Sequence, residues 1–136
     1  MVFEQHGSFR LWCHGNVVYA ELSGTWNKET AEQFAGEFKT LAQQVDKPWA
    51  HMVYLQDWEL CSAEVFAVIQ ALVDWCLEHG LVRAAQVYPP STMKREFLDR
   101  MVVERKGQFQ RAVFDNAYQG ALWLTHEGFE ANVSKV

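Results

Sequence analysis

Carboxylates, an aromatic ring and a hydroxyl group gather in one short stretch near the middle of the chain. Asp57, Trp58 and Glu59 follow an apolar run, and Ser62 precedes a run with helical spacing. Paired acids in such a turn could transfer protons or bind a cation. The same residue types also suit structural tasks, since Asp orders turns and Ser is a preferred helix cap. The stretch predicts a functional site at one edge of the fold, but it indicates no particular reaction.

A second pair of reactive side chains, Cys76 and His79, lies three residues apart on an expected helix. That spacing suits two metal ligands, but two ligands do not make a site, and the alternative is a buried thiol beside a helix-terminal imidazole. The sequence has no Gly-x-Ser-x-Gly elbow and no glycine-rich phosphate loop after a strand. We therefore expect no metal and no cofactor. The missing motifs favour a non-enzymatic role, although catalytic groups can also converge in space alone.

Size and composition indicate an ordinary globular chain. Its 136 residues suit one domain, and a hydrophobic fraction of 49% is enough for a real core. The net charge of −5 argues against a nucleic-acid partner, which would select a basic face. Three cysteines without framework spacing indicate reduced thiols in a cytoplasmic protein. We find no signal peptide at the start of the sequence and no apolar run as long as a membrane span.

The sequence pattern predicts an α/β fold in the order β-β-α-β-α-β-α-β-α. Short runs of branched and aromatic residues predict five strands, at 9–13, 17–22, 49–55, 82–88 and 109–114. The first two are joined by a turn signal and should form an antiparallel hairpin. Helical periodicity predicts four helices, capped by Asn27, by Ser62, by Ser91 and by Asp115 or Asn116. We expect one domain over residues 1–136, with a mixed, mostly parallel sheet, a core at about 8–126 and a loose tail.

This order, at this length, resembles the STAS domain (sulfate transporter and anti-sigma-factor antagonist), and more closely the SpoIIAA-like group of small bacterial proteins. The matching features are residues 18–24 with Trp26, the strand end at Asp57-Trp58, the helix end at Trp75-Cys76 before Gly80, and residues 121–124. The resemblance implies a cytoplasmic regulatory module that binds a partner protein and is not an enzyme.

The resemblance also implies a phosphorylation switch at the start of the helix that follows the central strand. Ser62 falls near the matching place and is the candidate phosphosite. The chain has Leu60-Cys61-Ser62-Ala63 there, in place of the family's Asp-Ser-Ser-Gly-like turn. Glu59 and Glu64 flank the serine, and their charges would repel a phosphoryl group that the helix N-terminus would attract.

The carboxyl ends of parallel strands share one edge of a sheet, where open α/β folds place their ligands. Seven residues are expected along that edge as a binding surface: Thr25, Trp26, Asp57, Trp58, Glu59, Ser62 and Ser91. We expect Trp26 and Trp58 to flank a cleft there, since a Trp in a turn must pack on a neighbour or offer a face to a partner.

An alternative function is the carriage or sensing of a small apolar or lipid-like ligand. The many aromatic residues and a helix with a wide apolar face motivate it. We expect the cavity between the sheet and a helix over 91–106, lined by Met93, Phe97 and Met101, although ordinary core packing would explain the same residues. The hairpin edge near 9–13 could also pair two copies in a homodimer.

Overall fold

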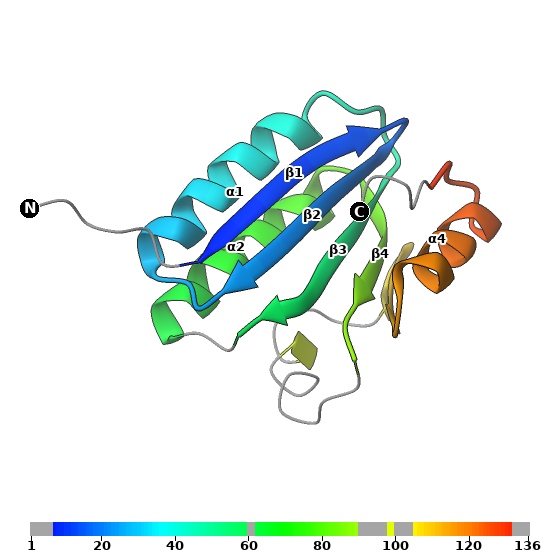
Figure 1. Ribbon diagram of the computed structural model, residues 1–136. Helices are drawn as coiled ribbons and strands as arrows, with labels where there is room; N and C mark the ends of the chain where they lie inside the picture. The colour runs from blue at the N-terminus through cyan, green and yellow to red at the C-terminus, as the bar shows by residue number, and fades with distance from the viewer. Residues whose placement is uncertain (1–6, 60–61, 90–97, 100–104, 132–136) are drawn as a thin grey trace, which may run out of the picture.

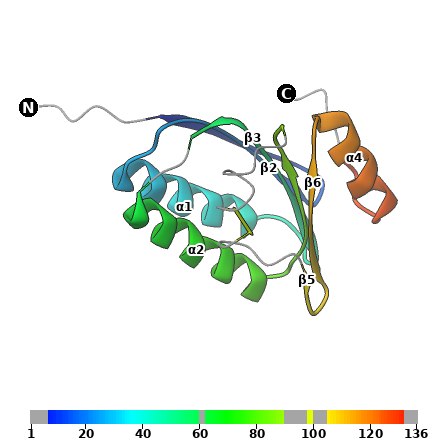
Figure 2. The ribbon, with the colours of Figure 1, turned by 90° about the horizontal axis from the view of Figure 1, so that it is seen from below.

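The computed structural model describes residues 7–59, 62–89, 98–99 and 105–131. The strands are β1 (Ser8–His14), β2 (Val17–Gly24), β3 (Trp49–Trp58), β4 (Leu81–Val87), β5 (Arg105–Lys106) and β6 (Phe109–Phe114), and the helices are α1 (Lys28–Ala42), α2 (Ala63–Glu78) and α4 (Ala117–His126). Within these residues one six-stranded sheet has the order β1-β2-β3-β4-β6-β5. Helices α1 and α2 cover one face and α4 the other, so the molecule has three layers (Figures 1 and 2).

The sheet is mixed and mostly parallel, as the sequence predicted. β1 and β2 form the antiparallel hairpin, whereas β2, β3, β4 and β6 run parallel to their neighbours. The two-residue strand β5 was not predicted, and it pairs antiparallel with β6. The prediction of a helix over 91–106 is therefore wrong at its C-terminal end, where the chain doubles back into a hairpin. Of the remaining residues in that range, the structure describes Leu98 and Asp99, which are helical.

Three helix starts are capped by the side chains that the sequence indicated. Asn27 accepts a hydrogen bond from the Thr30 amide at 2.9 Å, and Asn116 accepts one from the Gln119 amide at 2.9 Å. Ser62 caps α2 in the same way. These caps satisfy amides that have no partner inside the helix, which is why short polar residues begin each helix. The described chain therefore has three of the four expected helices. Nothing among these helices has the length and apolar character that a membrane crossing requires.

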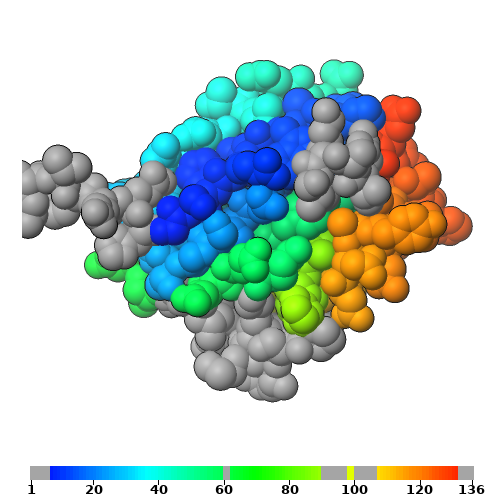
Figure 3. Space-filling model, in the orientation of Figure 1, coloured from blue at the N-terminus to red at the C-terminus, as the bar shows by residue number. Residues whose placement is uncertain are grey.

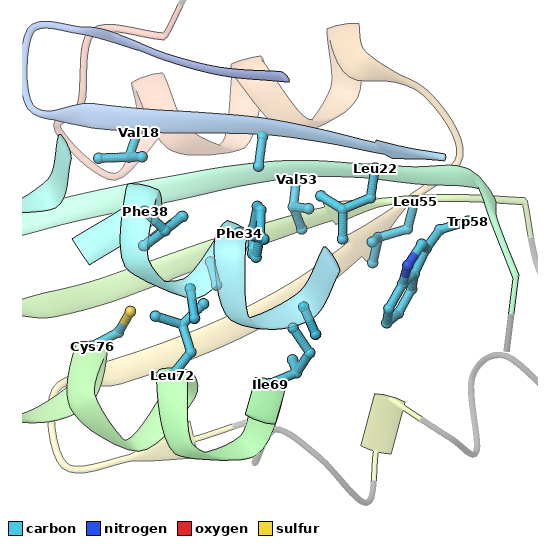
Figure 4. Close-up of a cluster of buried hydrophobic side chains, with 14 of the residues drawn as sticks. Val18, Leu22, Phe34, Phe38, Val53, Leu55, Trp58, Ile69, Leu72 and Cys76 are labelled. Atoms are coloured by element: carbon cyan, nitrogen blue, oxygen red, sulfur yellow. The ribbon is translucent and has the colours of Figure 1, made fainter. Parts of the chain in front are cut away.

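Alternation along the strands divides the interior into two cores. On β3, Trp49, Val53 and Leu55 face α1 and α2, whereas Met52 and Tyr54 face α4. We call these the α1/α2 core and the α4 core. Figure 4 shows the first, with the sheet residues pointing toward the two helices. β3 therefore serves both cores with alternate residues.

β3 continues three residues beyond its predicted end at Leu55 because β2 keeps pairing with it. Glu21 pairs with Tyr54, but Ser23 pairs with Asp57, so β3 carries one extra residue there. Such a bulge moves the following side chains to the opposite face. Trp58 is thereby turned into the α1/α2 core, and Asp57 is left exposed. The expected turn through Asp57, Trp58 and Glu59 is wrong, since the strand includes the first two.

Candidate functional site

The polar residues predicted along the carboxyl-end edge lie at the surface. Thr25, Asp57 and Glu59 are all exposed, where β2 and β3 end beside each other. The Thr25 hydroxyl donates a hydrogen bond to the Glu59 carboxylate, and the Glu59 amide donates to the Gly24 carbonyl at 3.1 Å. The edge is thus an ordered polar surface rather than a turn.

Ser62 is also exposed, and its oxygen accepts a hydrogen bond from the Val65 amide at 3.4 Å. Its role as a helix cap is therefore confirmed, whereas its phosphorylation stays a prediction. Glu64 follows in the first helical turn, where a carboxylate is favoured by the helix dipole. Ser91, the remaining predicted edge residue, lies outside the described residues.

Trp26 and Trp58 meet, but they form no cleft. The two rings are 3% and 2% exposed, and they pack edge to face with centroids 5.7 Å apart. The Trp26 ring also packs on that of Phe34, with centroids 5.2 Å apart, and its indole nitrogen donates a hydrogen bond to the Ser23 carbonyl at 3.0 Å. The expectation of a cleft between the two rings is wrong, because the bulge in β3 turns Trp58 inward.

The same bulge places Trp58 against a cavity inside the α1/α2 core. The cavity has a volume of about 80 Å³ and lies between the sheet, α1 and α2. Figure 4 shows labelled side chains of the sheet, α1 and α2 converging on this region. Its apolar walls include Phe34, Phe38, Val53, Trp58, Ile69 and Leu72. An apolar ligand cavity was the alternative prediction, and its described lining comes chiefly from strands of the sheet, with further residues from α1 and α2.

The residues predicted to line a cavity were Met93, Phe97 and Met101, and all three lie outside the described residues. Leu98 comes from the same segment; it is 3% exposed and lines the cavity. The segment that was expected to line a cavity therefore contributes at least Leu98 to this one. The contribution of the three predicted residues stays a prediction.

His51 is one of two polar residues in the described lining. Burial lowers the pKa of His51 to about 4, although its hydrogen bond to a backbone carbonyl acts in the opposite direction. The ring is therefore neutral near pH 7. Its Nδ1 atom lies 3.0 Å from the Val18 carbonyl oxygen, and its ring packs edge to face on Phe38. Because a carbonyl only accepts, Nδ1 carries the proton and Nε2 does not.

Gln86 is the other polar residue in the described lining, and it belongs to a buried network. Arg111 donates from Nη1 to the Gln86 side-chain oxygen at 2.8 Å, and its Nη2 atom pairs with Asp99. The Arg111 side chain is 1% exposed, and that of Asp99 is 43% exposed. A buried guanidinium is tolerated when it is paired in this way. The network fixes the orientation of the Gln86 amide group.

Cys76 and His79 take on separate structural roles. The Cys76 thiol lines the cavity, and burial raises its pKa to about 12, which leaves it protonated and unreactive near neutral pH. The His79 Nδ1 atom lies 2.6 Å from the Trp75 carbonyl oxygen, and its ring stacks on that of Trp75. Among the described side chains no group of three potential metal ligands assembles.

No family model matches the sequence, and no curated protein matches it either. Solved structures do match. One is an uncharacterised protein of the DUF3478 family with a SpoIIAA-like fold from Shewanella loihica PV-4, at a TM-score of 0.64 and 13% identity over 91% of this chain and 98% of that one. This chain has the SpoIIAA-like fold. The protein TM1081 matches at a TM-score of 0.58 and 19% identity, over 94% of this chain and 93% of that one.

The polar residues on the cavity side of the sheet were not identified from the sequence as candidate site residues. His51, Gln86 and Arg111 each interrupt an apolar strand, and each shares the inward parity of buried neighbours. Arg111 lies between Phe109 and Val113, both of which pack in the α1/α2 core. A polar residue at an inward position of a strand was the available signal, since such residues are buried only with a partner or a purpose.

Proposed function

We propose that this protein carries or senses a small apolar ligand, held in the cavity of the α1/α2 core. The observation that supports this is an apolar cavity between the sheet, α1 and α2. Protein interiors pack as densely as organic crystals, so a void of this kind is a departure from the normal state. Binding by an apolar ligand would restore the lost contacts.

The cavity volume limits the ligand. A single buried water needs about 10–15 Å³, and an engineered cavity of about 150 Å³ in another protein binds benzene. The present volume of about 80 Å³ lies between these values. A ligand of a few carbon atoms fits the cavity as it is, and a longer one must displace lining side chains.

Trp58 connects this cavity with the surface. Its ring lines the cavity, and the adjacent residues Asp57 and Glu59 are exposed at the edge. A ligand that moves the ring would move the end of β3, and with it the polar surface. This connection supports a sensor as well as a carrier.

Native mass spectrometry tests the proposal. The protein is exposed to a small-molecule extract of its own cells, and a denatured sample serves as control. We expect an added mass that is lost on denaturation, and that is absent from an Ala84→Leu variant whose new side chain fills the cavity. An adduct that this variant keeps would place the ligand elsewhere. A protein without an adduct would contradict the proposal.

A second candidate function is a protein-interaction module of STAS type, which binds through the carboxyl-end edge. The exposed cluster of Thr25, Asp57, Glu59 and Ser62 supports it. Charged and hydroxyl groups on a rigid strand end suit recognition of a polar partner surface.

Charge reversal tests this second function. Asp57→Lys changes the edge without touching the core, and Glu37→Lys on exposed α1 is the matched control. A partner retained from a lysate by the wild type and by Glu37→Lys, but lost by Asp57→Lys, would support the edge as the binding surface. Equal retention by all three proteins would contradict it.

A further inference from the structure

The His51 ring lines the cavity and has an unused hydrogen-bond acceptor. Its Nδ1 proton is donated to Val18, so the lone pair of Nε2 is free to accept. Within the described part of the structure, no side chain or amide donates to Nε2. An acceptor that faces an apolar interior without a donor is destabilising.

Gln86 lines the same cavity and has an unused donor. Its side-chain oxygen faces the Arg111 guanidinium, which has donors only, so the oxygen and nitrogen of the amide are assigned without ambiguity. The NH₂ group is then left on the other side, and no described residue accepts from it. The residue is 5% exposed and lines the cavity.

The register of the sheet places these two groups near each other. His51 pairs with Ala84 and Val53 pairs with Gln86, so the two polar residues are diagonal neighbours on adjacent strands. Both project from the same face of the sheet, toward α1 and α2. Strand spacing of about 4.8 Å and a rise of about 3.3 Å per residue place the two backbone positions about 8 Å apart, which polar tips can bridge through one intervening atom.

We propose that the ligand carries a hydroxyl group, which donates to Nε2 of His51 and accepts from the side-chain NH₂ of Gln86. This inference rests on the proposed function of the cavity. A hydroxyl both donates and accepts, so it satisfies the two groups at once. The rest of the ligand is apolar, to match the walls. The ligand class is a small neutral alcohol or phenol.

A carboxylate does not fit this arrangement. It would face the lone pair of Nε2, and the described lining contains no charged side chain. The guanidinium of Arg111 is already engaged by Gln86 and Asp99. An ammonium group fits no better, since it cannot accept from the Gln86 amide.

The test compares two probes that share a four-carbon chain, 1-butanol and 1-chlorobutane. Their affinities are measured by NMR titration of wild-type protein and of His51→Asn. The Asn side chain can still donate toward Val18 from the position of Nδ1, and it removes Nε2. We expect the variant to lose about tenfold in affinity for 1-butanol, as for an unsatisfied buried hydroxyl, and to change less than twofold for 1-chlorobutane.

Each outcome separates the two proposals. If both affinities change equally, or if only 1-chlorobutane binds, the hydroxyl inference is overturned and the cavity function stands. If neither probe binds, the cavity function itself fails. Should His51→Asn not fold, the ¹⁵N chemical shift of Nε2 in wild-type protein decides. This chemical shift must change when 1-butanol is added and stay constant when 1-chlorobutane is added. If 1-butanol leaves the chemical shift unchanged, the inference is overturned.

Discussion

The two faces of the sheet are built from alternate residues of the same strands, yet they are packed differently. In the α4 core, a Cβ atom added to Gly120 would lie 3.0 Å from the Met52 sulfur, which leaves no spare room. The α1/α2 core contains the cavity, and the buried Gln86 and Arg111 lie on that side. The two faces therefore differ in that the α1/α2 side contains a cavity lined in part by polar side chains, whereas the α4 side is tightly packed at Gly120. Sites are commonly found where such rules are broken.

The two faces of the sheet also differ in how far helices cover them. Figure 3 shows atoms of β1, β2 and β3 (blue to green) at the surface on the side of the sheet that carries α4 (orange), so α4 covers that side only in part. Arg10 and Glu21 form an exposed ion pair there, with 2.9 Å between Nε and Oε1. Such a pair contributes little to stability. β1 is also an edge strand, so the predicted pairing of two copies through it stays a prediction.

The largest expected effect comes from enlarging two adjacent alanines on β4. Ala85 is fully buried in the α4 core, whereas Ala84 lines the cavity. We expect Ala85→Leu to lower the free energy of unfolding by about 2–3 kcal/mol, through overpacking. Ala84→Leu fills existing space and should change the free energy of unfolding by less than about 1 kcal/mol. Urea unfolding measures both, and equal losses would show that the two faces are packed alike.

A smaller effect is expected from pH. The pKa of His51 is lowered to about 4 from its ordinary 6.5, so the folded state binds this proton less readily than the unfolded state. Stability from this group is therefore complete above about pH 6.5 and declines as pH falls toward 4. Between pH 7.5 and pH 5 the loss should be about 2 kcal/mol.

The control for this pH dependence is His51→Asn, which has no imidazole to protonate. Its stability should fall by about 2 kcal/mol less than that of the wild type over the same interval, in matched denaturant titrations. Parallel pH profiles for the two proteins would show that His51 is not held neutral by its surroundings.

The smallest effect is expected at the edge. Ser62→Ala removes the cap of α2 and should lower the free energy of unfolding by about 1 kcal/mol, without altering ligand binding in the cavity. Ser62→Asp restores an acceptor and should recover most of that loss. A thermal unfolding series compares the three proteins. If Ser62→Ala is as stable as the wild type, the capping hydrogen bond contributes nothing.

Local features of this fold were predictable from sequence, because neighbouring residues determine them. The hairpin around Gly15, the caps Asn27 and Ser62, and the bounds of β6 all follow from turn chemistry and alternation. The short strand β5 was not predicted, because two residues carry no periodic signal.

The candidate site was less predictable, because it depends on pairing between distant segments. The bulge in β3 exists only against β2, and it decides that Trp58 is buried while Asp57 is exposed. A cavity is the space that packing leaves, and no single residue encodes it. His51 and Gln86 acquire their meaning from their shared face of the sheet, which the order of strands determines.

The central claim is that the cavity of the α1/α2 core accepts an apolar guest. Crystals of the protein held under xenon pressure test this most directly, since xenon enters apolar cavities and scatters strongly. We predict one xenon atom between Phe38, Val53 and Leu72, and none at that place in Ala84→Leu. An interior without xenon at that place in the wild type would contradict the account.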